Sequence, residues 1–179
     1  MGNFTETGDD RSEFQIAEFT PSPDLVDLLA ERDDAASVLV LPRTVEGDRG
    51  VYRETDLIAV KTLRHQGVPI DFLHPADRRT FQSEYSAELV IFLMVFVAQA
   101  LSEQAIQGLA QYLWNRFRNA TSPGAASSPP ELTVEISRFA ADGTRLELEG
   151  VRISGQDADQ VLKAVERTLR VGLPPSEDD

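Results

Sequence analysis

The strongest candidates for a catalytic or binding role lie in the segment Asp-Phe-Leu-His-Pro-Ala-Asp-Arg-Arg at residues 71–79. His74 beside Asp77 could serve as a general base or as one metal ligand, while Arg78, with Arg43 from an earlier loop, could grip a carboxylate or phosphate. One histidine and one aspartate do not define a metal site, so no metal and no cofactor are expected. The competing interpretation is structural: His74 and Asp77 close a turn, and Asp77 caps the helix that follows.

No catalytic signature accompanies this segment. The chain contains no glycine-rich phosphate loop, no dinucleotide fingerprint, no nucleophile elbow and no HExxH zinc motif. Whether the protein is an enzyme therefore stays open, with a non-enzymatic role favoured.

The pattern of apolar residues predicts the strands and helices that carry this segment. Strands are predicted at residues 14–19, 37–41 and 68–73, helices from Pro23 and over residues 55–66, and a long loop over residues 42–53. This order indicates an α/β fold that begins with a small three-stranded parallel βαβαβ layer. Ligands of such a sheet bind beyond the carboxyl ends of the strands, where Arg43 and His74 would lie.

Residues 80–119 contain no proline and a single glycine, Gly108, and are predicted as one long helix. The helix is apolar on every face over residues 89–98 and amphipathic after that. The apolar part is too short to span a bilayer, so it is either enclosed by the fold or covered by another protein. The side chains predicted to form an interface are Leu89, Ile91, Phe92, Val95, Phe96, Leu109, Leu113 and Trp114.

A second unit is predicted after a linker rich in proline, serine and glycine. Strict alternation around Asp142-Gly143 predicts a hairpin, a shift of that alternation at Gly150 predicts a bulge, and a final helix completes a ββα unit. The expected organisation is a disordered acidic tail at 1–12, an α/β domain at 13–119, the linker at 120–130, the separate ββα unit at 131–171 and an acidic tail at 172–179.

Charge and composition restrict the partners. A formal net charge of −13 argues against nucleic acid and disfavours contact with anionic membranes. The chain has no cysteine and its first residues do not form a signal peptide, so a cytoplasmic location is expected. Basic residues are nearly all arginine, which is typical of a GC-rich bacterial genome.

The segment LTVEISRFAADGTRLELEGVRISGQDADQVLKAVERTL, at residues 132–169, resembles the small accessory domains that accompany effectors in bacterial conflict and defence systems. The resemblance implies an accessory role in a bacterial multi-protein system. It carries over no functional residue.

Two functions follow from these observations. The favoured one is a non-enzymatic adaptor that oligomerises or docks on a partner protein through residues 80–119. The alternative is an enzyme or small anionic-ligand binder at the strand-end rim, using Arg43, His74, Asp77 and Arg78. A dimer or larger assembly would support the first, and a concave pocket at the rim would support the second.

Overall fold

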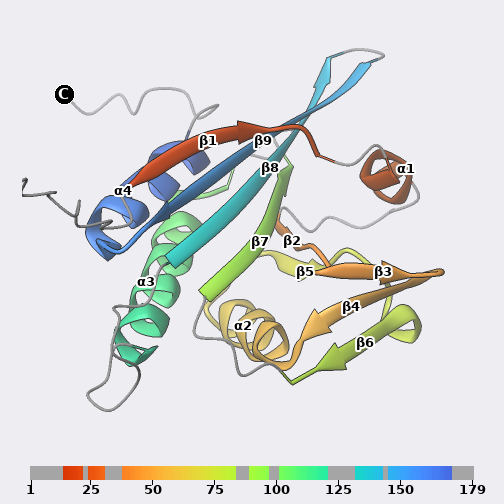
Figure 1. Cartoon of the computed structure of the whole chain (residues 1–179), viewed down its shortest axis with the longest axis horizontal. Helices are drawn as coiled ribbons and strands as arrows, with labels where there is room; N and C mark the ends of the chain where they lie inside the picture. The colour runs from red at the N-terminus through yellow and green to blue at the C-terminus, as the bar shows by residue number, and fades with distance from the viewer. Residues whose placement is uncertain are drawn as a thin grey trace, which may run out of the picture.

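The computed structural model of the chain shows a mixed α/β fold (Figure 1). It describes residues 14–21, 24–30, 38–83, 89–96, 101–120, 132–142 and 145–170. In these ranges, four α-helices pack with a six-stranded sheet and a three-stranded sheet.

The larger sheet mixes parallel and antiparallel strands in the order β1-β9-β8-β7-β2-β5. β2 (Val38–Val40) is parallel to β5 (Ile70–Phe72) and antiparallel to β7 (Leu89–Phe96). β1 (Gln15–Phe19) forms the opposite edge, antiparallel to β9 (Arg145–Gly155). The predicted three-stranded parallel layer is therefore not confirmed, because β9, β8 and β7 separate β1 from β2.

The long helix predicted over residues 80–119 does not form. Residues 89–96 are the strand β7, and only Glu103–Ala120 are helical, as α3. β7 lies inside the sheet, and its backbone pairs with β2 on one side and β8 on the other. An apolar run of this length has no period that separates helix from strand, and its β-branched and aromatic residues favour a strand. β8 pairs with β7 along all of residues 89–96, and β2 pairs with Leu93, Met94 and Val95, so this stretch is built into the sheet as a strand.

The hairpin predicted in the C-terminal part is confirmed, and it is joined to the rest of the fold. β8 (Leu132–Asp142) pairs with β9 in one continuous register, with Ser137 opposite Gly150, so the predicted bulge is wrong. β8 also runs parallel to β7 along the whole length of β7. The final helix, α4 (Ala158–Arg170), packs against α3. These elements thus belong to the main sheet rather than to a separate unit.

A small sheet forms where the sequence predicts a loop over residues 42–53. β3 (Thr44–Glu46) and β4 (Arg49–Arg53) make a hairpin, and Gly47 in its turn adopts the left-handed region with φ +65°. β4 also pairs in parallel with β6 (Arg79–Gln82). This pairing brings the two ends of the segment 50–82 side by side.

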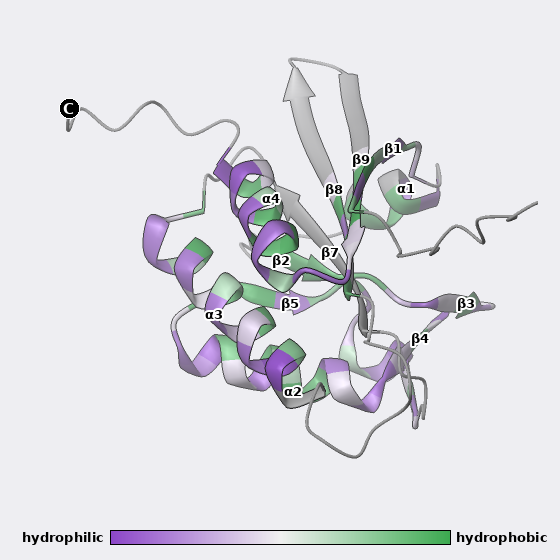
Figure 2. Ribbon diagram, turned by 60° about the vertical axis from the view of Figure 1, so that its left-hand side comes forward, coloured by the Kyte–Doolittle hydropathy of each residue, from purple (hydrophilic) through white to green (hydrophobic). Residues whose placement is uncertain are grey.

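The helices divide unequally between the two faces of the large sheet (Figure 2). α2 (Glu54–His65), α3 and α4 cover one face and enclose the main core, which includes Val38 and Val40. α1 (Asp24–Ala30) lies on the other face, where its Leu29 packs with Leu39 and Leu73. β2 is therefore buried on both faces, as its uniformly apolar sequence predicts.

Two groups of expectations fall on residues that the structure does not describe. The predicted tails lie outside the described residues, and so does the predicted linker, except for Ala120. Among the helices that are described, none has the length and hydropathy needed to cross a membrane.

Candidate functional site

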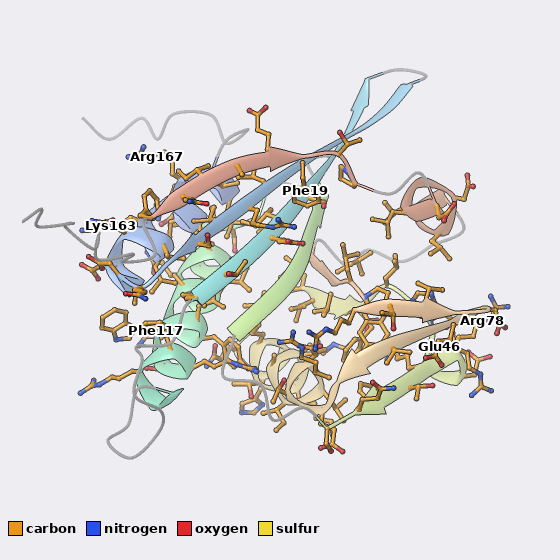
Figure 3. All side chains as sticks on the ribbon, in the orientation of Figure 1. Phe19, Glu46, Arg78, Phe117, Lys163 and Arg167 are labelled. Carbon is orange, nitrogen blue, oxygen red and sulfur yellow. The ribbon has the colours of Figure 1, made fainter. Side chains whose placement is uncertain are left out.

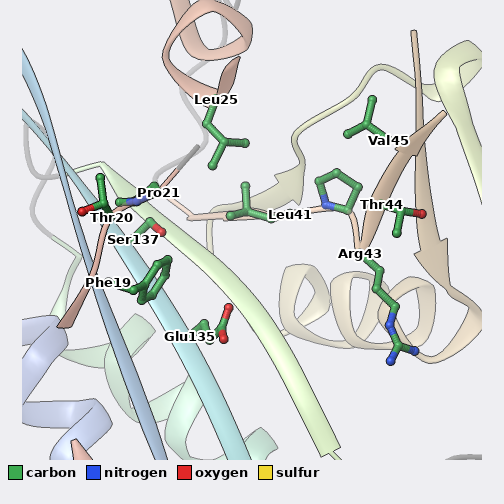
Figure 4. Close-up of a pocket in the computed structure, with 11 residues that line it drawn as sticks. Phe19, Thr20, Pro21, Leu25, Leu41, Arg43, Thr44, Val45, Glu135 and Ser137 are labelled. Atoms are coloured by element: carbon green, nitrogen blue, oxygen red, sulfur yellow. The ribbon is translucent and has the colours of Figure 1, made fainter. Parts of the chain in front are cut away.

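A pocket of about 310 Å³ opens on the face of the large sheet that carries α1 (Figure 4). Its walls come from the end of β1, from α1 and from the chain between β2 and β3, and its floor comes from β8. The apolar lining residues are Phe19, Pro21, Leu25, Leu41, Pro42 and Val45, and the polar ones are Thr20, Arg43, Thr44, Glu135 and Ser137.

Gly150 of β9 shapes one wall of the pocket. It lies directly opposite Phe19 in the β1–β9 pair, and a Cβ added there would be 2.6 Å from Cζ of the Phe19 ring. The missing side chain therefore lets the ring lie across the sheet. The ring forms the wall nearest β1 together with Thr20 and Pro21.

Glu135 lies at the floor of the pocket and is only 8% exposed. It is paired with Arg152, its direct neighbour on β9, whose Nε donates a hydrogen bond to Oε1 of Glu135. The Arg152 guanidinium also lies 5.8 Å from the centroid of the Phe19 ring. Since an unpaired buried carboxylate is costly, this contact is what makes the acidic group tolerable there.

The floor still offers hydrogen-bonding capacity. Within the part of the chain that the structure describes, the second carboxylate oxygen of Glu135 accepts no hydrogen bond. The hydroxyl of Ser137, in a residue that is 1% exposed, likewise has no partner among the described residues. A bound group with a hydrogen-bond donor would satisfy both acceptors.

Replacing Arg152 with alanine is expected to lower the free energy of unfolding by about 1–3 kcal/mol. The change leaves the Glu135 carboxylate buried without its cation, while the half-exposed Arg152 side chain itself contributes little to the core. Urea denaturation would measure the loss. Adding Glu135→Gln to Arg152→Ala should recover part of the lost stability, and a further loss would contradict this account.

The four residues predicted to form a rim site are not gathered in the pocket. Arg43 lines it, but its guanidinium points away from Leu25 (Figure 4). Asp77 and Arg78 are exposed in the short 3-10 helix Ala76–Arg78, so the prediction that Asp77 caps an α-helix is wrong. Figure 3 shows Arg78 at the outer end of the small sheet, far from Phe19.

His74 is the fourth of these residues, and it is enclosed in the core at 2% exposure. The Tyr52 hydroxyl lies 2.9 Å from His74 Nδ1 and accepts a hydrogen bond from the His74 backbone N–H at 3.1 Å. The same hydroxyl therefore lies against both the backbone and the ring of His74, and it holds the imidazole in place. His74 therefore stabilises the contact between β4 and the chain after β5, away from the pocket.

The acidic and basic residues flanking His74 also hold the structure together. Asp71 Oδ1 lies 2.5 Å from Nη2 of Arg64 and 3.4 Å from Nη2 of Arg79. The Arg79 guanidinium in turn lies 4.6 Å from the centroid of the Phe72 ring. The segment 71–79 is thus bonded into the fold by several contacts, which agrees with the structural interpretation of its charged residues.

The side chains predicted as an interface are divided between two elements. Leu109 and Leu113 of α3 are each 1% exposed and belong to the main core, whereas Trp114 is 36% exposed. Leu89, Ile91, Phe92, Val95 and Phe96 lie in β7, inside the sheet rather than on a helix.

Asp56, in the first turn of α2, is a second buried acid. Its Oδ2 accepts a hydrogen bond from the Arg53 backbone N–H at 3.0 Å. Burial raises the pKa of Asp56, while that hydrogen bond and the positive charges of Arg53, Arg116 and Arg43 act in the opposite direction. The carboxylate thus carries a net desolvation cost despite its basic neighbours.

Stability should depend on pH through this group. The pKa of Asp56 in the folded protein is raised above 3.8, so folding favours the protonated carboxyl. This contribution to the free energy of unfolding is fully present below pH 3.8 and is lost as the pH rises through the folded pKa. Asparagine does not ionise, so the Asp56→Asn protein should not lose this contribution. Its free energy of unfolding relative to the wild type should therefore increase as the pH rises through the folded pKa of Asp56. Urea unfolding of both proteins at a series of pH values would test this, and a constant difference would contradict it.

Sequence reasoning identified Arg43 but missed Phe19, Glu135 and Ser137. Glu135 and Ser137 lie at alternate positions of the first strand of the predicted hairpin, and such a position carries no functional meaning by itself. Gly150 gave the usable signal, since glycine inside a strand often marks a close approach of another group. The partner that approaches it comes from β1, which no local pattern reveals.

Among the described residues that line the pocket there is no histidine or lysine, and the acid among them, Glu135, is paired with Arg152. Among the described residues, no group of three or more His, Asp or Glu side chains is placed to hold a metal ion. Comparison of the chain with protein-family models, with curated proteins and with solved structures found no match.

Proposed function

We propose that the protein is a non-enzymatic accessory component of a bacterial multi-protein system, acting in the cytoplasm, and that it binds a partner protein through the pocket beside α1. One observation supports this above all: the pocket has apolar walls, and Glu135, the acid among its described lining residues, already has a cation. At about 310 Å³ it is near the lower end of the volumes of ligand sites. That volume suits one large apolar side chain of a partner, used as an anchor.

A catalytic role has less support. A general acid or base must reach the reacting group, and the buried histidine, His74, is held by Tyr52 outside the pocket. Glu135 forms its ion pair with Arg152 within the sheet. The described lining residues therefore include no pair of groups that could activate a nucleophile in the way that hydrolases and transferases do.

The chemistry of the pocket also defines the partner. A carboxylate at the floor of a chain with net charge −13 disfavours an anion, even with Arg43 nearby. The anchor is accordingly an apolar side chain with a neutral or basic neighbour, whose N–H can bond Glu135 or Ser137. This replaces docking through residues 80–119, because β7 is part of the sheet. Nucleic acid and membrane lipids have no role in the proposal.

Selection of peptides from a random phage-displayed library on the full-length chain would test the proposal. The selected peptides should share an apolar anchor with neutral or basic neighbours. Val45→Asp, at a pocket residue that is 52% exposed, should weaken their binding by about tenfold or more. Ile58→Asp is the matched control, since Ile58 is 62% exposed on α2, outside the pocket.

Binding to the Ile58→Asp variant should equal binding to the wild type. Two results would overturn the proposal. One is that no enriched peptide is weakened by Val45→Asp, and the other is that the enriched peptides are acidic.

A further inference from the structure

The two edges of the six-stranded sheet are treated differently by the chain. At the β5 edge, the backbone groups that point away from β2 are already bonded. Arg64 Nε donates to the Ile70 carbonyl at 2.8 Å, and the Ile70 N–H donates to the Val68 carbonyl at 2.9 Å. The Phe72 N–H donates to the Asp71 carboxylate at 2.7 Å. A strand edge whose donors and acceptors are used in this way offers little to an added strand.

The β1 edge has no such protection in the described part of the chain. β1 pairs with β9 along one side, from Gln15 opposite Ser154 to Phe19 opposite Gly150. No described side chain or strand bonds the backbone groups along its other side. Its residues from Gln15 to Glu18 are exposed, and Ile16 is 58% exposed. An open strand edge of this kind is a template for pairing with another chain.

We propose that the occupant of this edge is β1 of a second copy, paired antiparallel about a twofold axis at Ala17. Antiparallel pairing of a strand with its own copy uses the same patch on both protomers, so it closes as a dimer. An axis at Ala17 is the register that pairs all five residues of β1.

Side-chain chemistry favours this register as well. With the axis at Ala17, Ile16 lies opposite Glu18 of the second copy, so no like charges face each other directly. An axis at Glu18 would place two carboxylates opposite one another in a chain that already carries a charge of −13. The two Ile16 side chains become diagonal neighbours on the face that carries α4, which covers apolar surface that the monomer exposes. This inference does not depend on the pocket or its partner.

The absence of cysteine from the chain permits a direct test of the register. Residues directly opposite each other in an antiparallel pair have Cα atoms about 4.5–5.5 Å apart, within the range of a disulfide. The full-length Ala17→Cys protein, treated with oxidised glutathione, should form a disulfide-linked dimer that dithiothreitol dissolves. Gln15→Cys, which would face Phe19 of the second copy, should cross-link far less, and so should Ile58→Cys on α2.

Molar mass by light scattering provides a second measurement that needs no cross-link. The wild type is expected to be a dimer, Ile16→Lys a monomer, and the control Ile58→Lys a dimer, with all three folded by circular dichroism. A monomeric wild type at all concentrations would overturn the proposal. Equal cross-linking of Ala17→Cys and Ile58→Cys, or a dimer that Ile16→Lys leaves intact, would do so too.

Discussion

Replacing Gly50 with alanine is expected to lower the free energy of unfolding by about 3 kcal/mol. The added Cβ would lie 2.4 Å from Nδ1 of His74 and 2.8 Å from Cε2 of Tyr52. Both rings are buried and bonded to each other, and the Gly50 backbone is held opposite Arg79 in the β4–β6 pair. Since neither the rings nor the strand can move freely, the clash must be relieved by loosening the small sheet. Urea denaturation followed by circular dichroism would measure the loss.

A double-mutant cycle separates this clash from a general effect of alanine in a strand. His74→Ala removes the nearest atoms, so Gly50→Ala should cost less than half as much in that background as in the wild type. An equal cost in both backgrounds would show that the loss does not arise from the contact with His74.

Replacing Tyr52 with phenylalanine is expected to cost about 2–3 kcal/mol, although it removes a single oxygen atom. That oxygen lies 3.1 Å from the backbone nitrogen of His74 and 2.9 Å from its Nδ1. His74 is only 2% exposed. Two buried polar groups thus lose a partner at once, and water cannot replace it. The aromatic packing of Tyr52 on Phe72, with ring centroids 4.8 Å apart, is retained.

Tyr112→Phe is the matched control for this change. The Tyr112 hydroxyl accepts a hydrogen bond from Arg116 Nη1 at 3.0 Å, and the same nitrogen also donates to the Thr55 carbonyl. Tyr112 is only partly buried, so its loss should cost no more than about 1 kcal/mol. Equal losses for the two variants would show that the burial of His74 is not the source of the Tyr52 effect.

Local patterns in the sequence were sufficient to identify several elements. Pro23 and the apolar residues after it predicted α1, and the helix predicted over residues 55–66 corresponds to α2. The alternation around Asp142 predicted the β8–β9 hairpin. Each of these features is specified by residues that are neighbours in the chain.

The strand β7 shows where such patterns fail. Residues 89–96 are apolar throughout, so they fit a buried helix and a buried strand equally well. Because residues 80–119 contain no proline, the prediction extended the helix α3 back over these residues. What makes them a strand is pairing with β2 and β8, and those partners lie far away in sequence.

The sequence did not predict the pocket because its residues come from strands that are distant in the chain. Arg43 and His74 were placed together because both were expected at the same edge of a parallel sheet. The added hairpin β3–β4 instead carries Tyr52 against His74, while the positive charge of Arg43 acts on Asp56 of α2. The pocket combines residues from β1, α1 and β8, a combination that only the order of strands in the sheet determines.

The pairing of β1 with β9 also has a consequence for how the chain acquires its fold. Gln15 lies opposite Ser154, so β1 must wait until the residues of β9 have left the ribosome before it can pair. Sheets that depend on such distant contacts have high contact order and fold slowly. During synthesis, β1 emerges long before its neighbour, and a nascent chain is then exposed to association with other nascent chains. Chaperone contact at this stage should therefore affect the yield of native protein more than its final stability.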